Sequence, residues 1–506
     1  MMMAENAKLG KLNGYLDTAR ELFTYVRQAA AEGTPIHTVE QGIWQRVLQM
    51  GQQALAEFLT CQGDGDVGEK LTMPDGHEVK RLEERHLRCY QSIFGQFELS
   101  RAVYGSREGQ KIEYVPLDAR LQLPEGEYSY VLQDWTQALG VEYAFARTAE
   151  TLQMILGLKI PVDSLERINR KMAEAVDGVR QSLPAPAEKE EAEFLVATAD
   201  AKGIPMRRGV DQTPAGCRRT KGQKANKKQM ATIGCVYTVD PKQRTAEEVV
   251  AALFREKKAP EDEWADPEPV AEQKRIWSSL SYEREDQVIA GEEVVFAWMA
   301  TEVSRRRYPG QPLVCLMDGQ NSLWTARETY LPADENVVEI LDLLHVTPRL
   351  WEAAYLFHPE GSAEAAQFVR ERLSGILAGK AGYVVGGLRQ MGTKHRLRGS
   401  KRRKLQTICN YLGSNLARMR YDWYLREGFP IASGVIEGAC RHVVKDRMER
   451  AGMRWTVAGA QAMLDLRTTY INGHWSAFQS YRIDQERQRL YPNHQLQTHT
   501  PCRLAA

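Results

Sequence analysis

Apolar residues recur with helical spacing through the first sixty residues of the chain. The pattern begins at Leu9, Leu12, Leu16, Ala19, Leu22, Phe23 and Val26, and it continues from Val39 to Leu59. Such spacing predicts amphipathic helices. Glycine and aspartate crowd residues 63–76 and indicate a loop, whereas alternation over 86–105 predicts two short strands around Gly95.

A second helical region begins near Tyr128 and contains a helix-turn-helix pattern. Residues 146–156 predict one helix, 157–161 a turn, and 162–172 a second helix with Arg167 and Arg170 on its polar side. A basic second helix of this kind is typical of proteins that contact DNA. The same pattern is also compatible with a plain helical hairpin.

The pattern changes after the proline-punctuated polar linker 184–193. Strand-like runs at 194–199, 231–239, 313–317 and 337–341 alternate with helical stretches at 284–307 and 323–330, and 256–275 is an acidic, proline-rich surface stretch. This alternation predicts a mixed α/β sheet domain. The expected parts are 1–85 as a helical N-terminal region, 86–183 as a strand pair with a helix-turn-helix-like DNA-binding region, 194–345 as the first part of a catalytic core, 346–430 as a helical insertion, 431–480 as the last part of the core, and 481–506 as a C-terminal tail.

Three carboxylates stand at the ends of these elements. Asp200 and Asp318 each end an apolar strand-like run, and Glu437 lies near the start of a basic helical segment. A buried strand can end in a carboxylate at little cost if the group faces solvent or a cation. Three hard oxygen ligands suit Mg²⁺ or Mn²⁺, and two such ions about 4 Å apart can serve both halves of phosphodiester chemistry. A strand-terminal aspartate can also be only a turn residue or a helix cap.

Two further groups accompany these carboxylates. On a helix, Glu437, Arg441 and Lys445 would share one face, as a metal ligand beside phosphate-binding cations or as a surface ladder of ion pairs. Asp342 and His345 follow the strand-like run 337–341, and we expect both near the catalytic edge of the sheet. The other interpretation of this pair is an N-cap aspartate followed by a histidine in the first helical turn.

The net charge of +1 does not indicate whether the protein binds DNA, because local clusters of charge govern such binding. Basic residues gather in 206–228 and in 389–404, where they favour phosphate binding, although such runs can also be solvated loops. The candidates for DNA contact are Arg207, Arg208, Arg218, Arg219, Lys221, Arg402, Arg403, Lys404, Arg441, Lys445, Arg167 and Arg170.

Composition also indicates the compartment. The eight cysteines never form a Cys-x-x-Cys pair, which favours reduced thiols over a disulfide framework or a zinc site. The N-terminus lacks the apolar core of a signal peptide, and no run of about 18 apolar residues could span a membrane. We therefore expect a cytoplasmic protein with no membrane contact.

The chain resembles Asp-Asp-Glu transposases of bacterial insertion sequences, and most closely the ISKra family. The resemblance covers about residues 86–478 and rests on VATADAKG at 196–203, LMDG at 316–319, ILDLLHV at 340–346, GVIEG at 434–438 and DRMERAGMRW at 446–455. It implies an RNase-H-like core, with Asp200, Asp318 and Glu437 as the catalytic, metal-binding triad. Asp342 and His345 resemble an Asp-x-x-His signature found in related transposases.

The resemblance implies an enzyme that binds the inverted-repeat ends of its element and, with Mg²⁺ or Mn²⁺, cuts and joins DNA strands. The expected partners are double-stranded DNA, as ends and as target, and further copies of the chain, with a dimer on DNA as the simplest assembly. Two alternatives remain at this point. One is a catalytically silent DNA-binding protein derived from a transposase, and the other is a structure-selective nuclease on the same core.

Overall fold

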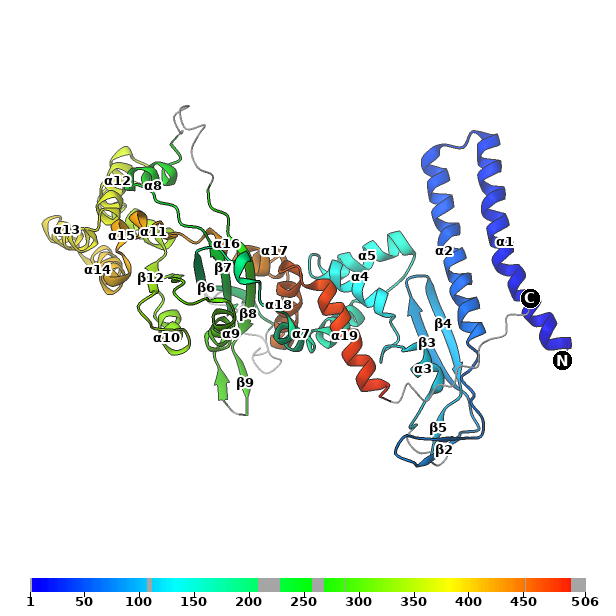
Figure 1. Cartoon of the computed structure of the whole chain (residues 1–506). Helices are drawn as coiled ribbons and strands as arrows, with labels where there is room; N and C mark the ends of the chain where they lie inside the picture. Colours follow the sequence, from blue (N-terminus) through cyan, green and yellow to red (C-terminus); the bar gives the residue numbers. More distant parts are fainter. Residues whose placement is uncertain are drawn as a thin grey trace, which may run out of the picture. The chain divides into compact units, whose positions relative to one another are not determined.

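The computed structural model describes residues 2–106, 112–207, 228–256, 268–285, 287–450 and 452–492. The chain forms two compact units (Figure 1). Unit 1 comprises Met1–Ala175 with Ser476–Ala506, and unit 2 comprises Val176–Trp475. The two ends of the chain therefore belong to the same unit.

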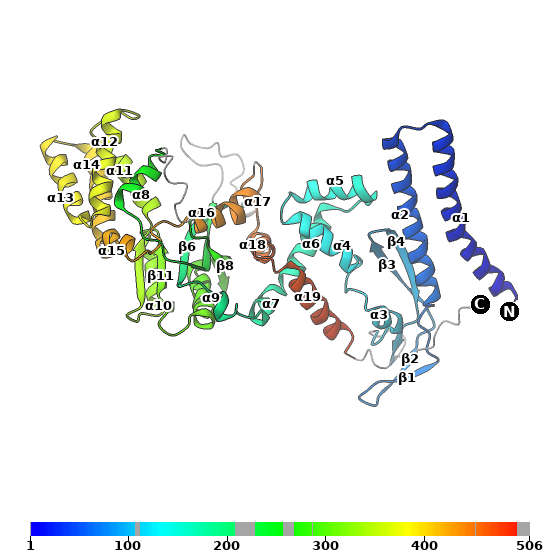
Figure 2. The ribbon, with the colours of Figure 1, turned by 45° about the horizontal axis from the view of Figure 1, so that its top comes forward.

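Unit 1 begins with two long helices, α1 (Met2–Glu32) and α2 (Ile36–Cys61), which lie side by side as a hairpin (Figures 1 and 2). The Thr18 hydroxyl donates to the Gln53 side chain at 2.6 Å across this hairpin. The strands expected around Gly95 are confirmed as the antiparallel pair β3 (His86–Ser92) and β4 (Gly95–Arg101). The glycine- and aspartate-rich stretch expected to be a loop contains a strand, since a second small sheet has the order β1 (Lys70–Thr72), β2 (Glu78–Arg81), β5 (Tyr104–Gly105).

The expected helix-turn-helix is confirmed as a structural element. Its helices are α5 (Phe145–Leu156) and α6 (Val162–Ala173), and Gly157 ends α5 with a positive φ of 70°. An L side chain rarely adopts that backbone conformation, so the glycine suits the turn. The remaining helices of this region are α3 (Pro116–Leu121) and α4 (Tyr130–Gly140).

The C-terminal residues expected to be a tail from 481 instead continue helix α19 (Trp475–Leu490). Phe478, Gln479 and Arg482 on this helix are buried, and Arg482 donates to the Gln133 side chain at 2.8 Å. The Tyr491 hydroxyl donates to the carbonyl oxygen of Leu123 at 2.6 Å. These contacts explain why the C-terminal helix belongs to unit 1.

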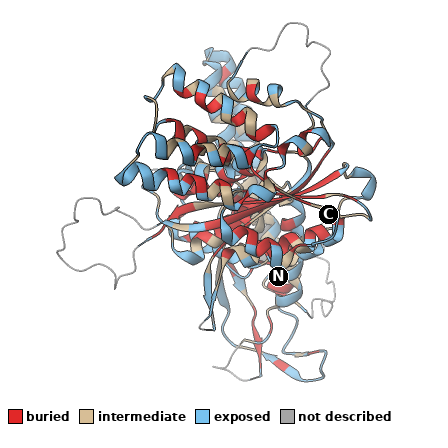
Figure 3. Ribbon diagram, turned by 90° about the vertical axis from the view of Figure 1, so that its left-hand side faces the viewer, coloured by how far each residue is buried: buried red, intermediate tan, exposed pale blue. Residues whose placement is uncertain are grey.

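Unit 2 is built on a mixed five-stranded sheet, which confirms the expected mixed α/β class. Its order is β12 (Val337–Leu341), β11 (Leu313–Met317), β6 (Phe194–Pro205), β7 (Lys228–Val239), β8 (Glu272–Leu280). β6, β11 and β12 run parallel, whereas β7 is antiparallel to β6 and β8. The buried residues of these strands form the red centre of Figure 3.

Three features of the sheet region differ from the sequence expectation. The strand expected to end before Asp200 continues through it to Pro205, because this second half of β6 pairs with β7. β8 begins inside the stretch that the sequence analysis interpreted as surface. The strand was not expected there because its first half is polar and only its last three residues are buried. The helix expected from 284 begins only at Gly291, since the hairpin of β9 (Tyr282–Arg284) and β10 (Gln287–Ile289) precedes it.

Helices cover the sheet on both faces. One face packs on α9 (Gly291–Arg306) and α10 (Asn321–Tyr330), with Leu195, Ala197, Ala199, Leu313, Cys315 and Met317 in the shared core. The expected helical insertion follows β12 and packs at that edge of the sheet. Its helices are α11 (Leu343–Ala354), α12 (Ala363–Leu377), α13 (Ala381–Lys394), α14 (Gly399–Ser414), the 3-10 turn Leu416–Arg418 and α15 (Tyr421–Arg426).

The remaining helices of unit 2 complete the second face and the connections. α16 (Gly434–Cys440), a π-helical turn (Arg441–Lys445) and α17 (Asp446–Met448) form one continuous segment. Outside it are α7 (Val176–Ser182), the 3-10 turn Glu188–Glu190, α8 (Ala246–Leu253) and α18 (Val457–Ile471).

A glycine on β7 sets how closely α9 approaches the sheet. A Cβ atom on Gly234 would lie 2.5 Å from a methyl carbon of Val295 and 2.9 Å from the sulfur of Met299. We expect Gly234→Val to destabilise unit 2 by about 1–3 kcal/mol through overpacking. A lower thermal midpoint of the full-length protein would measure this effect.

Gly386 provides the matched control for that substitution. It is an exposed residue of α13, and a Cβ atom added to it would meet no other atom within 4 Å. Gly386→Ala should leave the midpoint unchanged or raise it, because alanine favours helix by roughly 0.5–1 kcal/mol. Equal midpoints for Gly234→Val and the wild type would contradict the close packing of α9 on β7.

Candidate active site on the parallel strands

Three aspartates lie at one level across the three parallel strands. β6 pairs with β11 as Leu195 with Leu313, an offset of 313 − 195 = 118. The pairing ends at Ala197 with Cys315. Continued for three residues, the same offset sets Asp200 opposite Asp318, since 318 − 200 = 118. β11 pairs with β12 with an offset of 337 − 313 = 24, which places Asp318 beside Asp342. The Asp342 N–H donates to the Met317 carbonyl at 2.9 Å, in keeping with this register.

The three aspartates also share one face of the sheet. Side chains alternate between faces along a strand. Ala199 and Met317, which directly precede Asp200 and Asp318, belong to the core beneath α9. Asp200 and Asp318 therefore point to the opposite face, which is the face that α16 covers at β6. Neighbouring strands are about 4.8 Å apart, so the carboxylates stand in a row.

Asp200 is held by two donors. Its Oδ1 accepts the backbone N–H of Ala201 at 2.7 Å, and its Oδ2 accepts the thiol of Cys440 on α16 at 3.5 Å. Burial raises the pKa of the Cys440 thiol, and the charges of Asp200 and Glu437 raise it further. The thiol therefore stays protonated at neutral pH and acts as a donor to Asp200.

Asp318 also accepts two donors, both on the same oxygen. The N–H of Gly319 lies 2.5 Å from Oδ1, and the hydroxyl of Tyr411 on α14 lies 2.6 Å from it. Trp324 donates its indole N–H to the Asp318 carbonyl oxygen at 2.7 Å. The backbone and the side chain of Asp318 are thus both held by hydrogen bonds.

Asp342 and His345 confirm the helix-cap interpretation, and they also lie close to the other two aspartates. Asp342 caps α11, because its Oδ1 accepts the N–H of Leu344 at 2.8 Å. Its other oxygen lies 3.5 Å from Nδ1 of His345, a distance that fits an ion pair better than a short hydrogen bond. This contact with Asp342 raises the pKa of His345 to about 9, against the effect of burial and with help from the charges of Asp318 and Asp200. His345 thus lies within the field of all three aspartates.

Glu437 lies on α16. The buried Ser433 hydroxyl caps this helix by accepting the N–H of Ile436 at 3.3 Å, and it also lies 3.3 Å from the Thr198 hydroxyl on β6. Glu437 itself is exposed, and it lies one helical turn before Cys440, which contacts Asp200. The glutamate therefore lies on the helix that contacts Asp200, and its charge acts on the Cys440 thiol.

The expected stripe of Glu437, Arg441 and Lys445 on one regular α-helix is wrong. Residues Arg441–Lys445 form a π-helical turn, in which each residue advances less far around the axis than in an α-helix. Arg441 pairs with Asp446 at 3.6 Å, and both Arg441 and Lys445 are exposed. The two cations remain on the surface of this segment, but their directions do not follow from α-helical spacing.

The carboxylates of the site suit a hard divalent cation. Oδ2 of Asp318 has no hydrogen-bond or ion-pair partner among the described residues, and the Glu437 side chain is exposed. Across the described ranges, no three His, Cys, Asp or Glu side chains lie together as a group that could hold a metal ion. The donor chemistry fits Mg²⁺ or Mn²⁺, with Asp200 and Asp318 in the row and Glu437 beside it.

Apart from Arg441 and Lys445, the candidate DNA contacts of unit 2 fall into three groups. Arg402, Arg403 and Lys404 are exposed in the first turns of α14, and no acidic residue interrupts them. Arg207 is exposed where β6 ends, and its N–H donates to the carbonyl oxygen of Trp455 at 2.7 Å. Arg208, Arg218, Arg219 and Lys221 lie outside the described residues. No helix in the described part of the chain is long and apolar enough to cross a membrane.

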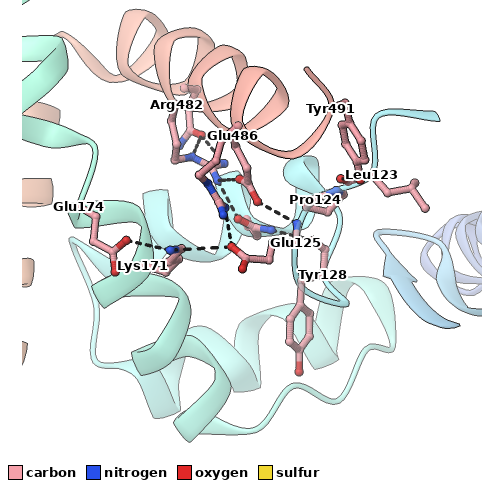
Figure 4. Close-up of polar contacts among 12 residues, drawn as sticks. Leu123, Pro124, Glu125, Tyr128, Lys171, Glu174, Arg482, Glu486 and Tyr491 are labelled. Atoms are coloured by element: carbon pink, nitrogen blue, oxygen red, sulfur yellow. Dashed lines mark hydrogen bonds and ion pairs between the residues drawn. The ribbon is translucent and has the colours of Figure 1, made fainter. Parts of the chain in front are cut away.

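In unit 1, α6 carries Arg167 and Arg170. Arg167 lines a cleft of about 610 Å³ together with α19 and the loop 125–128, and it lies 3.7 Å from Glu127. Lys171 reaches Glu174 and Glu125 in the same cleft, as Figure 4 shows. Arg170 is exposed. Because acidic neighbours compete with phosphates for Arg167, Arg170 is the better candidate of the two for DNA contact.

Two residues of the site were not found by sequence analysis. Tyr411 comes from the helical insertion, and nothing in its local sequence indicates that it reaches Asp318. Cys440 could have been found from its place three residues after Glu437, on the buried side of an amphipathic turn. Both act as donors to carboxylates.

The pair of Asp342 and His345 predicts a pH effect on the metal-free protein. Since the pKa of His345 in the folded protein is about 9, above its ordinary value of 6.5, its charge stabilises the fold fully below about pH 6.5, and this stabilisation is lost as pH rises through 9. Asp342→Asn keeps a capping side chain but removes the charge, so it should lower the pKa of His345. NMR titration of the histidines in the presence of chelator would measure this.

His474 is the internal control for the titration. Burial lowers its pKa, and the charge of Arg275 contributes to the lowering. Its titration should be the same in the Asp342→Asn variant and in the wild type. An unchanged pKa of His345 in that variant would contradict the coupling to Asp342.

Comparison with protein-family models and with curated proteins finds no match to this chain. The chemistry of the site is therefore inferred from its own residues: a row of aspartates, a neighbouring glutamate and exposed cations on the surrounding helices.

Proposed function

We propose that the protein is a DNA transposase that cuts and joins DNA strands at the ends of an insertion sequence, with Mg²⁺ or Mn²⁺ as cofactor. The single observation that carries this proposal is that Asp200 lies on β6 and Asp318 directly follows β11, the parallel strand paired with it. Glu437, on the helix that contacts Asp200 through Cys440, supplies the third carboxylate.

The order of the sheet supports an RNase-H-like core. Numbered by their order in the chain, the strands run 3-2-1-4-5 from β8 to β12, with β7 antiparallel to its neighbours. This is the arrangement of RNase-H-like folds. The first strand, β6, lies at the centre and carries Asp200, and the fourth, β11, leads directly into Asp318.

The residues of the site have separate roles in this proposal. Asp200, Asp318 and Glu437 would hold the divalent cations, whose chemistry when bound would be to make a water or a 3′-hydroxyl more acidic and to stabilise negative charge on the leaving oxygen. The Asp342 carboxylate orients His345, and the protonated His345 offers a positive charge near the aspartates. The chain itself forms no covalent bond to the substrate in this reaction.

The placement of cations supports a nucleic-acid substrate. Arg402, Arg403 and Lys404 lie on α14, the helix whose Tyr411 contacts Asp318. Over the seven residues from Lys404 to Tyr411, an α-helix rises about 10 Å, which is within reach of neighbouring phosphates along a DNA strand. Arg207 and Lys445 add exposed cations on segments next to Asp200 and Glu437.

Replacing any one of Asp200, Asp318 or Glu437 by alanine should abolish strand cleavage and joining. Loss of a cation ligand removes several kcal/mol of transition-state stabilisation, so we expect a fall of about 10³-fold or more. DNA-end binding should stay near the wild-type level, because it rests on the basic surfaces. Cleavage and strand-transfer assays with labelled ends, in Mg²⁺ and in Mn²⁺, would measure the two steps.

Asp446→Ala is the matched control, since Asp446 lies on the same segment as Glu437 but pairs with Arg441 and His442. It should retain most activity. A Glu437→Ala protein that joins ends at the wild-type rate would remove the third ligand from the mechanism. Cleavage without joining by the wild type would favour a structure-selective nuclease, and end binding without either step would favour a silent DNA-binding protein.

The basic turn of α14 predicts how DNA affinity responds to salt. Each phosphate contact contributes a slope of about −0.9 to the dependence of log K on log salt concentration. The triple replacement of Arg402, Arg403 and Lys404 by alanine should therefore flatten the slope by about two to three units. Binding isotherms across a salt series would measure it, and an unchanged slope would make this turn a solvated surface.

A further inference from the structure

The helical insertion reaches the candidate active site through one side chain. Tyr411 lies near the end of α14, and its hydroxyl donates to Oδ1 of Asp318 at 2.6 Å. The N–H of Gly319 approaches the same oxygen to 2.5 Å and lies 3.2 Å from the Tyr411 hydroxyl. Oxygen Oδ1 therefore has two donors at once, one from the sheet and one from the insertion.

The ring of Tyr411 is fixed in this place. The guanidinium of Arg349 lies 5.0 Å from its centroid, and the Asn415 side chain donates to the Tyr411 carbonyl oxygen at 2.9 Å. A Cβ atom on Gly319 would come within 2.6 Å of the ring. The glycine after Asp318 thus provides the space that the tyrosine occupies.

The two donors leave one oxygen of Asp318 available. Oδ2 has no hydrogen-bond or ion-pair partner within the described ranges of the chain. A carboxylate whose Oδ1 is fixed by two hydrogen bonds has a restricted rotation and presents Oδ2 in a defined direction. Groups that fix a metal ligand in this way typically change metal affinity by about 10–100-fold when they are removed.

We propose that Tyr411 is a positioning residue for cation binding: it fixes the Asp318 carboxylate so that Oδ2 faces the divalent cation. This inference rests on the proposed function, in which Asp318 is a metal ligand. It assigns a role to the insertion, because α14 carries the basic turn Arg402–Lys404 as well as Tyr411. One helix then joins a phosphate-binding surface to a ligand of the cation.

The insertion does not depend on Tyr411 for its attachment to the sheet. The Tyr421 hydroxyl donates to the Leu341 carbonyl oxygen at 2.6 Å, and the Tyr424 hydroxyl donates to the Glu339 carbonyl oxygen at 2.9 Å. Both contacts are with backbone atoms of β12. Loss of the Tyr411 hydroxyl should therefore leave the insertion folded and in place.

The test is Mn²⁺ binding by the full-length protein without DNA, measured by calorimetry and by the electron paramagnetic resonance signal of free Mn²⁺. Asp318→Ala identifies which part of the binding belongs to the site. Tyr411→Phe should weaken that part about 10-fold. Gly319→Ala, which pushes the ring away from Asp318, should weaken it as well. DNA-end binding should be unchanged in Tyr411→Phe.

Tyr424→Phe is the matched control, because it removes a hydroxyl from the same helical block without touching a carboxylate. It should bind Mn²⁺ like the wild type. If Tyr411→Phe also binds Mn²⁺ like the wild type, while Asp318→Ala does not, the positioning role is wrong and the proposed function stands. If the wild type and Asp318→Ala bind Mn²⁺ equally, Asp318 is not a ligand, and both proposals fail.

Discussion

The pairing of β6, β11 and β12 is the constraint on which the site depends. Three parallel strands in this register bring Asp200, Asp318 and Asp342 to one level. Two negative charges about 5 Å apart repel by roughly 3 kcal/mol at an effective dielectric constant of 20. The hydrophobic packing of the other face against α9 holds the strands in this register despite the repulsion. The fold thus favours positive charge or hydrogen-bond donors beside these three aspartates.

Hydrogen-bond donors to the three carboxylates offset part of this repulsion. Each of the three aspartates accepts a backbone N–H from a residue that follows it, namely Ala201, Gly319 or Leu344. Side chains from outside the sheet add to these: Cys440 at Asp200, Tyr411 at Asp318 and His345 at Asp342. Of these three side chains only His345 can bring a positive charge. In the proposed function, a divalent cation balances the remaining negative charge of the row.

Much of this arrangement could be predicted from the sequence, because it depends on local patterns. The apolar runs before Asp318 and Asp342 predicted the bounds of β11 and β12 as the structure has them, and the mixed α/β class followed from the alternation of strands and helices. β8 was missed because most of its residues are polar and only its pairing with β7 makes it a strand. The π-helical turn after Cys440 was missed because spacing arguments assume a regular α-helix. The register is a tertiary property without a local signal, and so is the contact of Tyr411 with Asp318, which joins residues 93 positions apart.

The site has a rigid part, the three aspartates, and an adaptable part, the exposed residues around them. The aspartates are fixed by strand pairing and by backbone donors, so their separation can change little without loss of the sheet. Glu437 and the cations lie on helices and on the ends of strands, and they are exposed. A DNA backbone varies in shape along its length, and surface cations on long side chains can follow it, whereas cation coordination tolerates only small displacements. Tyr411 stands at the boundary between these two parts, since it belongs to a helix of the adaptable surface and donates to a carboxylate of the rigid row. In the proposed function, the geometry of the carboxylates and the affinity for DNA therefore depend on different residues, and α14 carries residues of both kinds.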